Sequence, residues 1–308
     1  MNLGAHLSIA GGLHRACERG LELGCDAVQI FVKNERQWAA RPLEESEIRQ
    51  FREARQACGI RRAFAHGTYL VNLASPDPLL RKKSVDAFVE EIERCERLGL
   101  EFLVTHPGSP GDAGDEAGIL GIAKALDEVH RRTKGFSTRV LLETTAGQGA
   151  TLGWRFEQLR AILDRTGDPE RLGLCLDTCH VHAAGYDLSS AGGYERMMEE
   201  FGRRLGFGIL RAVHVNDSKP GAGSRVDRHE HIGRGTIGLE AFRRLMRDPR
   251  LKDVPKVLET PKEGDMDSVN LGILRRLAGF PLKPAAGRGR GGVKAPRRPK
   301  PPGGRRAE

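Results

Sequence analysis

The sequence predicts an α/β protein of the TIM (β/α)8 barrel class, and three observations support this prediction. Short apolar segments alternate with amphipathic helical segments eight times within residues 1–280. The residues that close the apolar segments recur at intervals of about 35 to 40, apart from one shorter and one longer interval. Six consecutive apolar segments end in a histidine or a carboxylate, as the strands around the mouth of a barrel enzyme often do.

Each element follows from the local pattern of apolar residues. The predicted strands, in chain order, are residues 2–7, 26–32, 61–66, 101–106, 138–143, 172–177, 210–215 and 256–259. Apolar residues at helical spacing predict helices at residues 13–21, 42–58, 85–98, 119–132, 156–163, 194–205, 239–246 and 269–277. A doubly wound open sheet is the alternative fold, but it would not gather so many polar strand ends around one point.

Residues 281–308 differ in composition from the rest of the chain. They contain six Pro, six Gly and almost no large apolar residue, which predicts a disordered tail outside a domain of residues 1–280. They also carry nine Lys/Arg and one acid, so that residues 1–280 contribute +1 to the formal charge of +9. The basic tail is therefore the part of the chain expected to be attracted to phosphate backbones.

The rest of the composition is that of a cytoplasmic protein. No run approaches the roughly 20 apolar residues of a membrane span, and the N-terminus lacks the features of a secretory signal. The cysteines form no C-x-x-C pair and are expected to be reduced core residues. Two of them flank Asp177 and could line a site there. The six are Cys17, Cys25, Cys58, Cys95, Cys175 and Cys179.

The strand ends are the first candidate site residues. A single histidine at such a place is more often part of hydrogen-bonded structure than a metal ligand. Six ligand-type side chains converging on one mouth are difficult to explain in that way, and converging carboxylates repel one another unless a cation lies among them. The six are His66, His106, Glu143, Asp177, His214 and Glu259.

Two loops add further candidates. His180 follows the sixth strand, with His182 as its competitor. Asp227 and His229 follow the seventh strand, and on extended backbone residues two apart face the same side, so that this pair could hold one ion. His231 shares their parity and competes with His229. Two other histidines lie in helical segments and are expected on the surface, namely His14 and His130.

Nine candidates result, five histidines and four carboxylates. Imidazole combined with carboxylate favours zinc over magnesium or calcium, with manganese and iron as alternatives. At three protein ligands per open site, nine ligands suit three metals, and a shared carboxylate would let two of them lie close together. Clustered metals of this kind suit phosphoryl transfer.

Nine motifs follow one another along residues 2–280: GAHLSIAGG, KNERQW, HGTYLVNL, HPGS, ETTAGQG, LDTCHVHAAGYDL, HVNDSK, GSRVDRHEHIG and LETP. In their order and joint presence they resemble endonuclease IV, the family of zinc-dependent apurinic/apyrimidinic endonucleases of DNA base-excision repair.

The resemblance implies a trinuclear zinc centre in which manganese could substitute. One zinc would be held by His66, His106 and Glu143. Glu143 would bridge to a second zinc, held also by Asp177, His214 and Glu259. The third would be held by His180, Asp227 and His229, in preference to His182 and His231.

The resemblance also implies a reaction and a substrate. The family cleaves the phosphodiester bond 5′ to an abasic site and leaves a 3′-hydroxyl and a 5′-deoxyribose phosphate; Glu143 and Glu259 are the residues predicted to be catalytic. Arg36, Tyr69 and Leu70 match residues that enter the minor groove and fill the gap at the abasic site, as wedges and arginines do in kinked DNA. The alternative is that Tyr69 and Leu70 only pack the barrel rim.

The predicted partner is therefore double-stranded DNA that contains abasic sites, bound by a monomer with no obligate protein partner and no membrane attachment. A metal-dependent sugar isomerase or epimerase on the same barrel is the main alternative, but such enzymes usually use one or two metals and largely oxygen ligands. A non-catalytic nucleic-acid binder with structural zinc is a further alternative, although structural zinc sites are usually closed and rich in cysteine.

Overall fold

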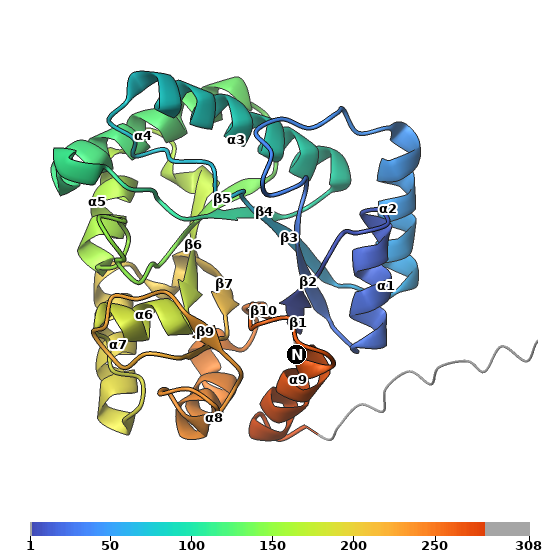
Figure 1. Cartoon of the computed structure of the whole chain (residues 1–308), viewed down its shortest axis with the longest axis vertical. Helices are drawn as coiled ribbons and strands as arrows, with labels where there is room; N and C mark the ends of the chain where they lie inside the picture. The colour runs from blue at the N-terminus through green and yellow to red at the C-terminus, as the bar shows by residue number, and fades with distance from the viewer. Residues whose placement is uncertain (1, 281–308) are drawn as a thin grey trace, which may run out of the picture.

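Eight parallel strands close into a barrel, and helices surround it (Figure 1). The computed structural model describes residues 2–280. The order around the barrel is β1-β10-β7-β6-β5-β4-β3-β2, so that neighbours in the chain are neighbours in the sheet. The strands are β1 (Leu3–His6), β2 (Ala27–Phe31), β3 (Arg62–His66), β4 (Phe102–Thr105), β5 (Arg139–Glu143), β6 (Leu172–Asp177), β7 (Leu210–His214) and β10 (Lys256–Leu258). The predicted TIM barrel is confirmed, whereas the predicted tail lies outside the described residues.

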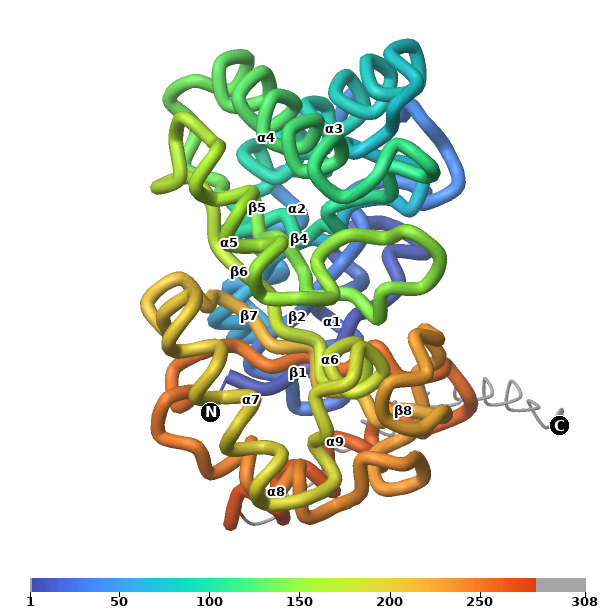
Figure 2. The backbone as a smooth tube through the Cα atoms, turned by 90° about the vertical axis from the view of Figure 1, so that its left-hand side faces the viewer, coloured from blue at the N-terminus to red at the C-terminus, as the bar shows by residue number. Residues whose placement is uncertain are grey.

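Helices connect the strands and pack on the outside of the barrel. Figure 2 shows the strands through the middle of the molecule, with α3 and α4 at one end of the view and α7, α8 and α9 at the other. The helices are α1 (His14–Glu22), α2 (Glu45–Ala57), α3 (Pro78–Leu98), α4 (Asp115–Arg132), α5 (Phe156–Arg165), α6 (Thr178–Ala184), α7 (Ala191–Arg204), α8 (Leu239–Arg247) and α9 (Met266–Leu277). Within residues 2–280, no helix is long and apolar enough to cross a membrane.

The interior of the barrel explains why the candidate residues meet at its mouth. A small apolar cluster fills the barrel, separate from the larger core between strands and helices; it comprises Ala27, Phe64, Val104, Leu141, Cys175, Ala212 and Val257. Alternate residues of a strand face the same side. Each side chain two positions beyond Phe64, Leu141 or Cys175 therefore points toward the mouth at the carboxyl end of the strands.

The structure differs from the sequence prediction in four elements, α3, α6, β8 (Asp217–Ser218) and β9 (His229–Glu230). Helix α3 begins at Pro78, because the Asp77 carboxylate caps it by accepting hydrogen bonds from the amides of Leu79 and Leu80. The short helix α6 directly follows β6 where a loop was expected. The strands β8 and β9 are short and antiparallel, and they pair within the long connection after β7.

Most cysteines lie where the sequence predicts, whereas one of the two histidines in helical segments does not. All six cysteines are free, and all except the partly exposed Cys58 are buried, as expected for reduced core residues. The expectation that His130 lies on the surface is wrong. Its side chain is on the buried face of α4, and the guanidinium of Arg171 donates to its carbonyl oxygen at 3.2 Å. His14 is partly buried.

Candidate metal centre

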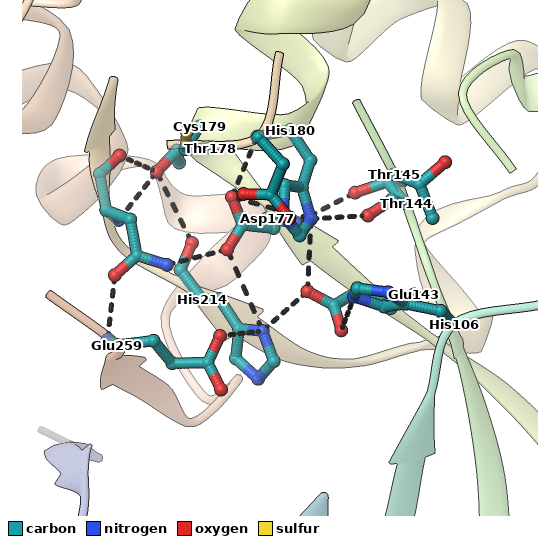
Figure 3. A network of polar contacts seen from close by, with 12 residues as sticks. His106, Glu143, Thr144, Thr145, Asp177, Thr178, Cys179, His180, His214 and Glu259 are labelled. Carbon is teal, nitrogen blue, oxygen red and sulfur yellow. Dashed lines mark hydrogen bonds and ion pairs between the residues drawn. The ribbon is translucent and has the colours of Figure 1, made fainter. Parts of the chain in front are cut away.

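The nine candidate residues lie together at the mouth of the barrel. Figure 3 labels His106, Glu143, Asp177, His180, His214 and Glu259 among them. Their ligand atoms form three groups, each with all atoms within 4.8 Å of one another. The first group is His66, His106 and Glu143. The second group is Glu143, Asp177, His214 and Glu259. The third group is His180, Asp227 and His229.

Glu143 belongs to two groups because its two carboxylate oxygens face different neighbours. Its Oε2 lies 3.0 Å from Nε2 of His66 and 3.3 Å from Nε2 of His106. Its Oε1 lies 2.8 Å from Nδ1 of His214. The side chain is fully buried, and Figure 3 shows it between His106 and His214. Glu143 is therefore placed to bridge cations held by the first and second groups.

Asp177 connects the second group to the third. As the last residue of β6 it is also the N-cap of α6, since its Oδ1 accepts a hydrogen bond from the amide of His180 at 2.8 Å. Its Oδ2 accepts from Nδ2 of Asn216 at 2.6 Å and lies 3.7 Å from Nε2 of His229 and 3.8 Å from Nδ1 of His214. The helix that Asp177 starts places His180 beside it.

The histidines of the third group are oriented by backbone carbonyls. Nδ1 of His180 donates to the carbonyl of Thr144 at 2.8 Å, and Nδ1 of His229 donates to that of Glu259 at 3.0 Å. The Nε2 atoms, which carry the lone pairs when the rings are neutral, then face each other at 3.4 Å, with the carboxylate of Asp227 3.2 Å from His180 and 3.5 Å from His229. Converging lone pairs of this kind call for a cation, and a histidine that binds a metal usually donates its other ring N–H to a carbonyl or carboxylate, as these two do.

His66 has the same arrangement. Its Nδ1 donates to the carbonyl of Gly67 at 2.7 Å, which leaves Nε2 directed at Glu143. Nitrogen from imidazole and oxygen from carboxylate together form a donor set that suits zinc. The residues present therefore fit the predicted metal, on the basis of their chemistry and orientation.

The charges in the cluster favour cations. Burial by itself lowers the pKa of His180, but the carboxylates of Asp177 and Asp227 hold that pKa well above its usual value. Burial raises the pKa of Glu143, but nearby imidazoles, His214 first among them, hold it well below its usual range. Protonated imidazoles thus balance the carboxylates in the metal-free protein. Metal ions could take over this role.

The two competing histidines lie outside the three groups. His182 is on another side of α6 from His180, and its Nδ1 accepts a hydrogen bond from the amide of Leu188 at 3.3 Å. His231 follows the end of β9, where the extended conformation that would align it with His229 stops. Its Nδ1 accepts from the side chain of Asn270 at 3.1 Å.

The two cysteines beside Asp177 differ in position. Cys175 faces the barrel interior. The thiol of Cys179 lies close to Asp177 and His229, but burial raises its pKa to about 12 and its Sγ is 3.5 Å from the carbonyl of Arg228. A neutral thiol is a poor metal ligand.

The predicted DNA-contacting residues lie at the rim. A cavity of about 790 Å³ is lined by Arg36, Tyr69 and Glu259, and a smaller one of about 210 Å³ by Tyr69 together with His66 and His106. The residue Tyr69 is 69% exposed, and the side chain of Arg36 is 88% exposed. Leu70 is partly buried beside Tyr69. The Tyr69 ring also packs at the rim, against Phe31 and His66 at centroid distances of 5.7 and 6.0 Å, and its contact with DNA stays a prediction.

Sequence reasoning missed Asn216, which supports two ligand candidates at once. Its fully buried side chain donates to Asp177, as described, and accepts from the amide of Glu259 at 2.7 Å. Its position two residues after His214 was a signal of its proximity to the site. Its amide has no ligand chemistry that would have singled it out.

Known proteins resemble this chain over most of its length. The family model described as "Xylose isomerase-like TIM barrel" matches residues 17–278. The "Probable endonuclease 4" of Geobacter sulfurreducens is 51% identical over 277 residues, or 89% of this chain and 94% of that protein. The "Probable endonuclease 4" of Chloroflexus aurantiacus is 48% identical over 276 residues, or 89% and 97%.

Solved structures also resemble this chain over most of its length. The crystal structure of endonuclease IV from Thermus thermophilus has a TM-score of 0.80 at 40% identity and covers 91% of this chain and 99% of that one. A D-tagatose 3-epimerase-like protein has a TM-score of 0.70 at 21% identity, covering 91% and 97%, which shows that it shares the fold.

Proposed function

This chain belongs to the endonuclease IV family, and from this premise we propose that it hydrolyses the phosphodiester bond 5′ to apurinic/apyrimidinic sites in double-stranded DNA, within base-excision repair. The products would be a 3′-hydroxyl and a 5′-deoxyribose phosphate. The observation that supports the proposal most is the sharing of Glu143 between two of three adjoining groups of ligand atoms. Adjacent cations are what phosphodiester hydrolysis uses.

The three groups would hold three zinc ions, with manganese as a substitute. Bound zinc supplies Lewis-acid stabilisation of the charge on a phosphoryl group and makes water acidic enough to attack at neutral pH. The first and second groups would hold a pair of ions that share Glu143, and the third group would hold one ion near Asp177.

Two carboxylates are proposed to act in catalysis. Glu143 is buried and would hold both members of the metal pair in place. Glu259 differs, because its side chain is 15% exposed and lines the large cavity where substrate would lie. Its carboxylate could therefore accept a proton from the attacking water, while the amide of its own backbone is fixed by Asn216.

Arg36, Tyr69 and Leu70 would bind the DNA. The exposed ring of Tyr69 stands between the two cavities beside the first and second groups, so a side chain inserted at the missing base would come next to the candidate metals. Wedges of this kind unstack and kink a duplex, and a nucleotide without a base costs less to extrude than a paired one.

Residues 1–280 would form the catalytic domain of a cytoplasmic monomer that needs no protein partner, and residues 281–308 would add affinity for DNA. A sugar isomerase or epimerase shares the fold, but the third group of ligand atoms has no role in the usual one- or two-metal centre of such an enzyme.

The test is cleavage of a duplex that contains one tetrahydrofuran abasic analogue, with and without chelator, against the same duplex without the lesion. We expect a cut 5′ to the lesion that chelator abolishes, and about three zinc ions per chain by elemental analysis. The absence of a chelator-sensitive cut would refute the proposal. One or two oxygen-preferring ions and ketose epimerisation would instead favour the isomerase.

A further inference from the structure

Gln29 is a buried polar residue that none of the roles above involves. It lies in the middle of β2 between the apolar residues Val28 and Ile30, and it is fully buried. It is two positions beyond Ala27 of the inner cluster, so its side chain points into the barrel. A buried amide at such a position needs hydrogen-bond partners.

Its partners belong to the candidate metal centre. The amide oxygen of Gln29 lies 2.8 Å from Nε2 of His214. Its amide nitrogen lies 2.5 Å from Oε1 of Glu259 and 2.9 Å from Nδ1 of His6. One side chain on β2 thus contacts β1, β7 and the end of β10.

The direction of these hydrogen bonds is determined by Glu259. An ionised carboxylate can only accept, so the amide NH2 group of Gln29 must face Glu259 and its oxygen must face His214. Nε2 of His214 must then carry the proton that is donated. The other nitrogen, Nδ1, is left to face Oε1 of Glu143 at 2.8 Å and Oε2 of Glu259 at 3.1 Å, within the second group.

His214 is therefore oriented differently from three of the other candidate histidines. His66, His180 and His229 each donate Nδ1–H to a backbone carbonyl, which no substitution can remove. His214 donates Nε2–H to a side chain. The orientation of this ligand depends on the residue at position 29.

We infer that Gln29 is a positioning residue, which fixes the tautomer of His214 and the orientation of Glu259 so that the second group can hold its cation. The inference rests on the proposed function, in that it requires the second group to bind metal. Loss of such a hydrogen-bonding partner typically lowers metal affinity about 10- to 100-fold.

The test compares three variants of the full chain. Gln29→Leu removes both halves of the hydrogen-bond pattern, whereas Gln29→Glu keeps an acceptor for His214 and loses the donor to Glu259. Gln158→Leu is the matched control, because Gln158 is also a buried glutamine with several hydrogen-bond partners, and these partners, the amides of Gly153 and Arg155 and the side chain of Asp115, include none of the nine candidate ligands. Thermal unfolding of each zinc-loaded variant reports whether it folds.

Two measurements are made, zinc retention in a graded series of chelator concentrations and long-range proton–nitrogen NMR of the His214 ring. We expect Gln29→Leu to release one zinc at about 10- to 100-fold lower chelator and to lose the fixed Nε2–H tautomer. Gln29→Glu should keep that tautomer, and Gln158→Leu should match the wild type in both.

The inference is overturned if Gln29→Leu retains zinc as the wild type does, or if Gln158→Leu loses it equally. An unfolded Gln29→Leu chain leaves the decision to Gln29→Glu, where a changed His214 tautomer would be the contrary result. Wild-type protein that binds no zinc would overturn the proposed function as well, which distinguishes the two failures.

Discussion

Asp177 shows how one residue can serve both the fold and the site. One of its oxygens caps α6, and the other accepts from Asn216 and faces His214 and His229. The carboxylate thus starts the helix that carries His180 while it lies between the second and third groups. A substitution at Asp177 should weaken zinc binding by both groups, and a substitution at His180 should weaken zinc binding by the third group.

Two substitutions test this division. Asparagine caps helices about as well as aspartate, so Asp177→Asn should fold, but its single oxygen cannot serve both His180 and Asn216. We expect it to weaken zinc binding by the second group most, by about tenfold or more. His180→Ala should first release the ion of the third group. Elemental analysis after dialysis against a graded series of chelator concentrations measures how much zinc each variant retains. Loss of the same ion from both variants would contradict the assignment of Asp177 to the second group and of His180 to the third.

The histidines predict a pH dependence whose sign changes with metal. Neighbouring carboxylates overcome burial and raise the pKa of His66 and His180 above the ordinary value of 6.5. In metal-free protein their stabilising contribution is complete below pH 6.5 and is lost as pH rises through the raised folded-state pKa values. The melting temperature of metal-free protein should therefore fall as pH increases above 6.5.

Zinc should reverse this trend. Metal competes with protons for the same nitrogens, so that zinc affinity should rise over the range in which metal-free stability falls, and zinc binding should release protons. Calorimetry in buffers of different ionisation enthalpy measures that release. Metal-free and zinc-loaded proteins with parallel pH profiles would show that these imidazoles are not the ligands.

The residue scale also shows where prediction from sequence ends. The nine ligand candidates could be named because histidines and carboxylates at strand ends are chemically conspicuous; whether they bind metal remains a prediction. Gln29 and Asn216 were not named, because amides are ordinary residues and their role depends on which neighbours they reach. The alternation that leads from Leu141 to Glu143 also leads from Ala27 to Gln29. Counting two positions from Ala27 could have located Gln29 once the inner residues of the barrel were known.

At the scale of elements, the long periodic segments were predictable and the short ones were not. Eight strands and their helices follow from apolar spacing, but α6 is too short to show a helical period. The pairing of β8 with β9 depends on Asp217, which is fully buried and accepts hydrogen bonds from the amides of Gly233, Gly235 and Ile237 at 2.9, 3.1 and 3.0 Å. Contacts of this kind across the connection after β7 leave no periodic pattern in the sequence.

Helix α3 links the two loops that carry the proposed DNA-binding residues. The ammonium of Lys33 lies 3.2 Å from Glu91 of α3, with both side chains fully buried, and donates to the carbonyl of Trp38 at 2.8 Å. Glu91 also accepts from the amide and hydroxyl of Thr68, at 3.1 and 2.8 Å. One buried carboxylate thus holds the loop of Arg36 and the loop of Tyr69.

We therefore expect Glu91→Gln to destabilise the protein by up to about 3–5 kcal/mol, because the buried Lys33 ammonium loses its nearest counter-charge and keeps only Glu90, 4.0 Å away. Asp86→Asn on the same helix is the control, since its pairs with Lys82 and Arg132 lie at the surface and should each contribute less than about 1 kcal/mol. Urea unfolding measures both. At a temperature where Glu91→Gln remains folded, its KM for abasic DNA should rise more than its kcat falls. An unchanged KM would show that the contacts of Glu91 with the two loops do not contribute to DNA binding.

At the scale of the whole molecule, the described part of the chain ends on the face opposite the candidate site. Phe280, the last described residue, shares a cavity with Asn2 and Lys256, which lie at the beginnings of β1 and β10, whereas the candidate ligands lie at the carboxyl ends of the strands. The nine Lys/Arg of residues 281–308 follow this point in the sequence. Whatever they add to DNA binding should be separable from the chemistry.

Truncation after Phe280 tests this separation. We expect cleavage of the abasic analogue at saturating DNA to be unchanged, while affinity falls most at low salt, because each phosphate neutralised contributes about 0.9 to the slope of log affinity against log salt. A full-length variant with the nine Lys/Arg changed to Gln should behave as the truncation does, since charge and not length causes the effect. Equal affinity of all three proteins across the salt range would show that the tail does not contact DNA. A lower cleavage rate at saturating DNA after truncation would show that the tail contributes to the chemical step.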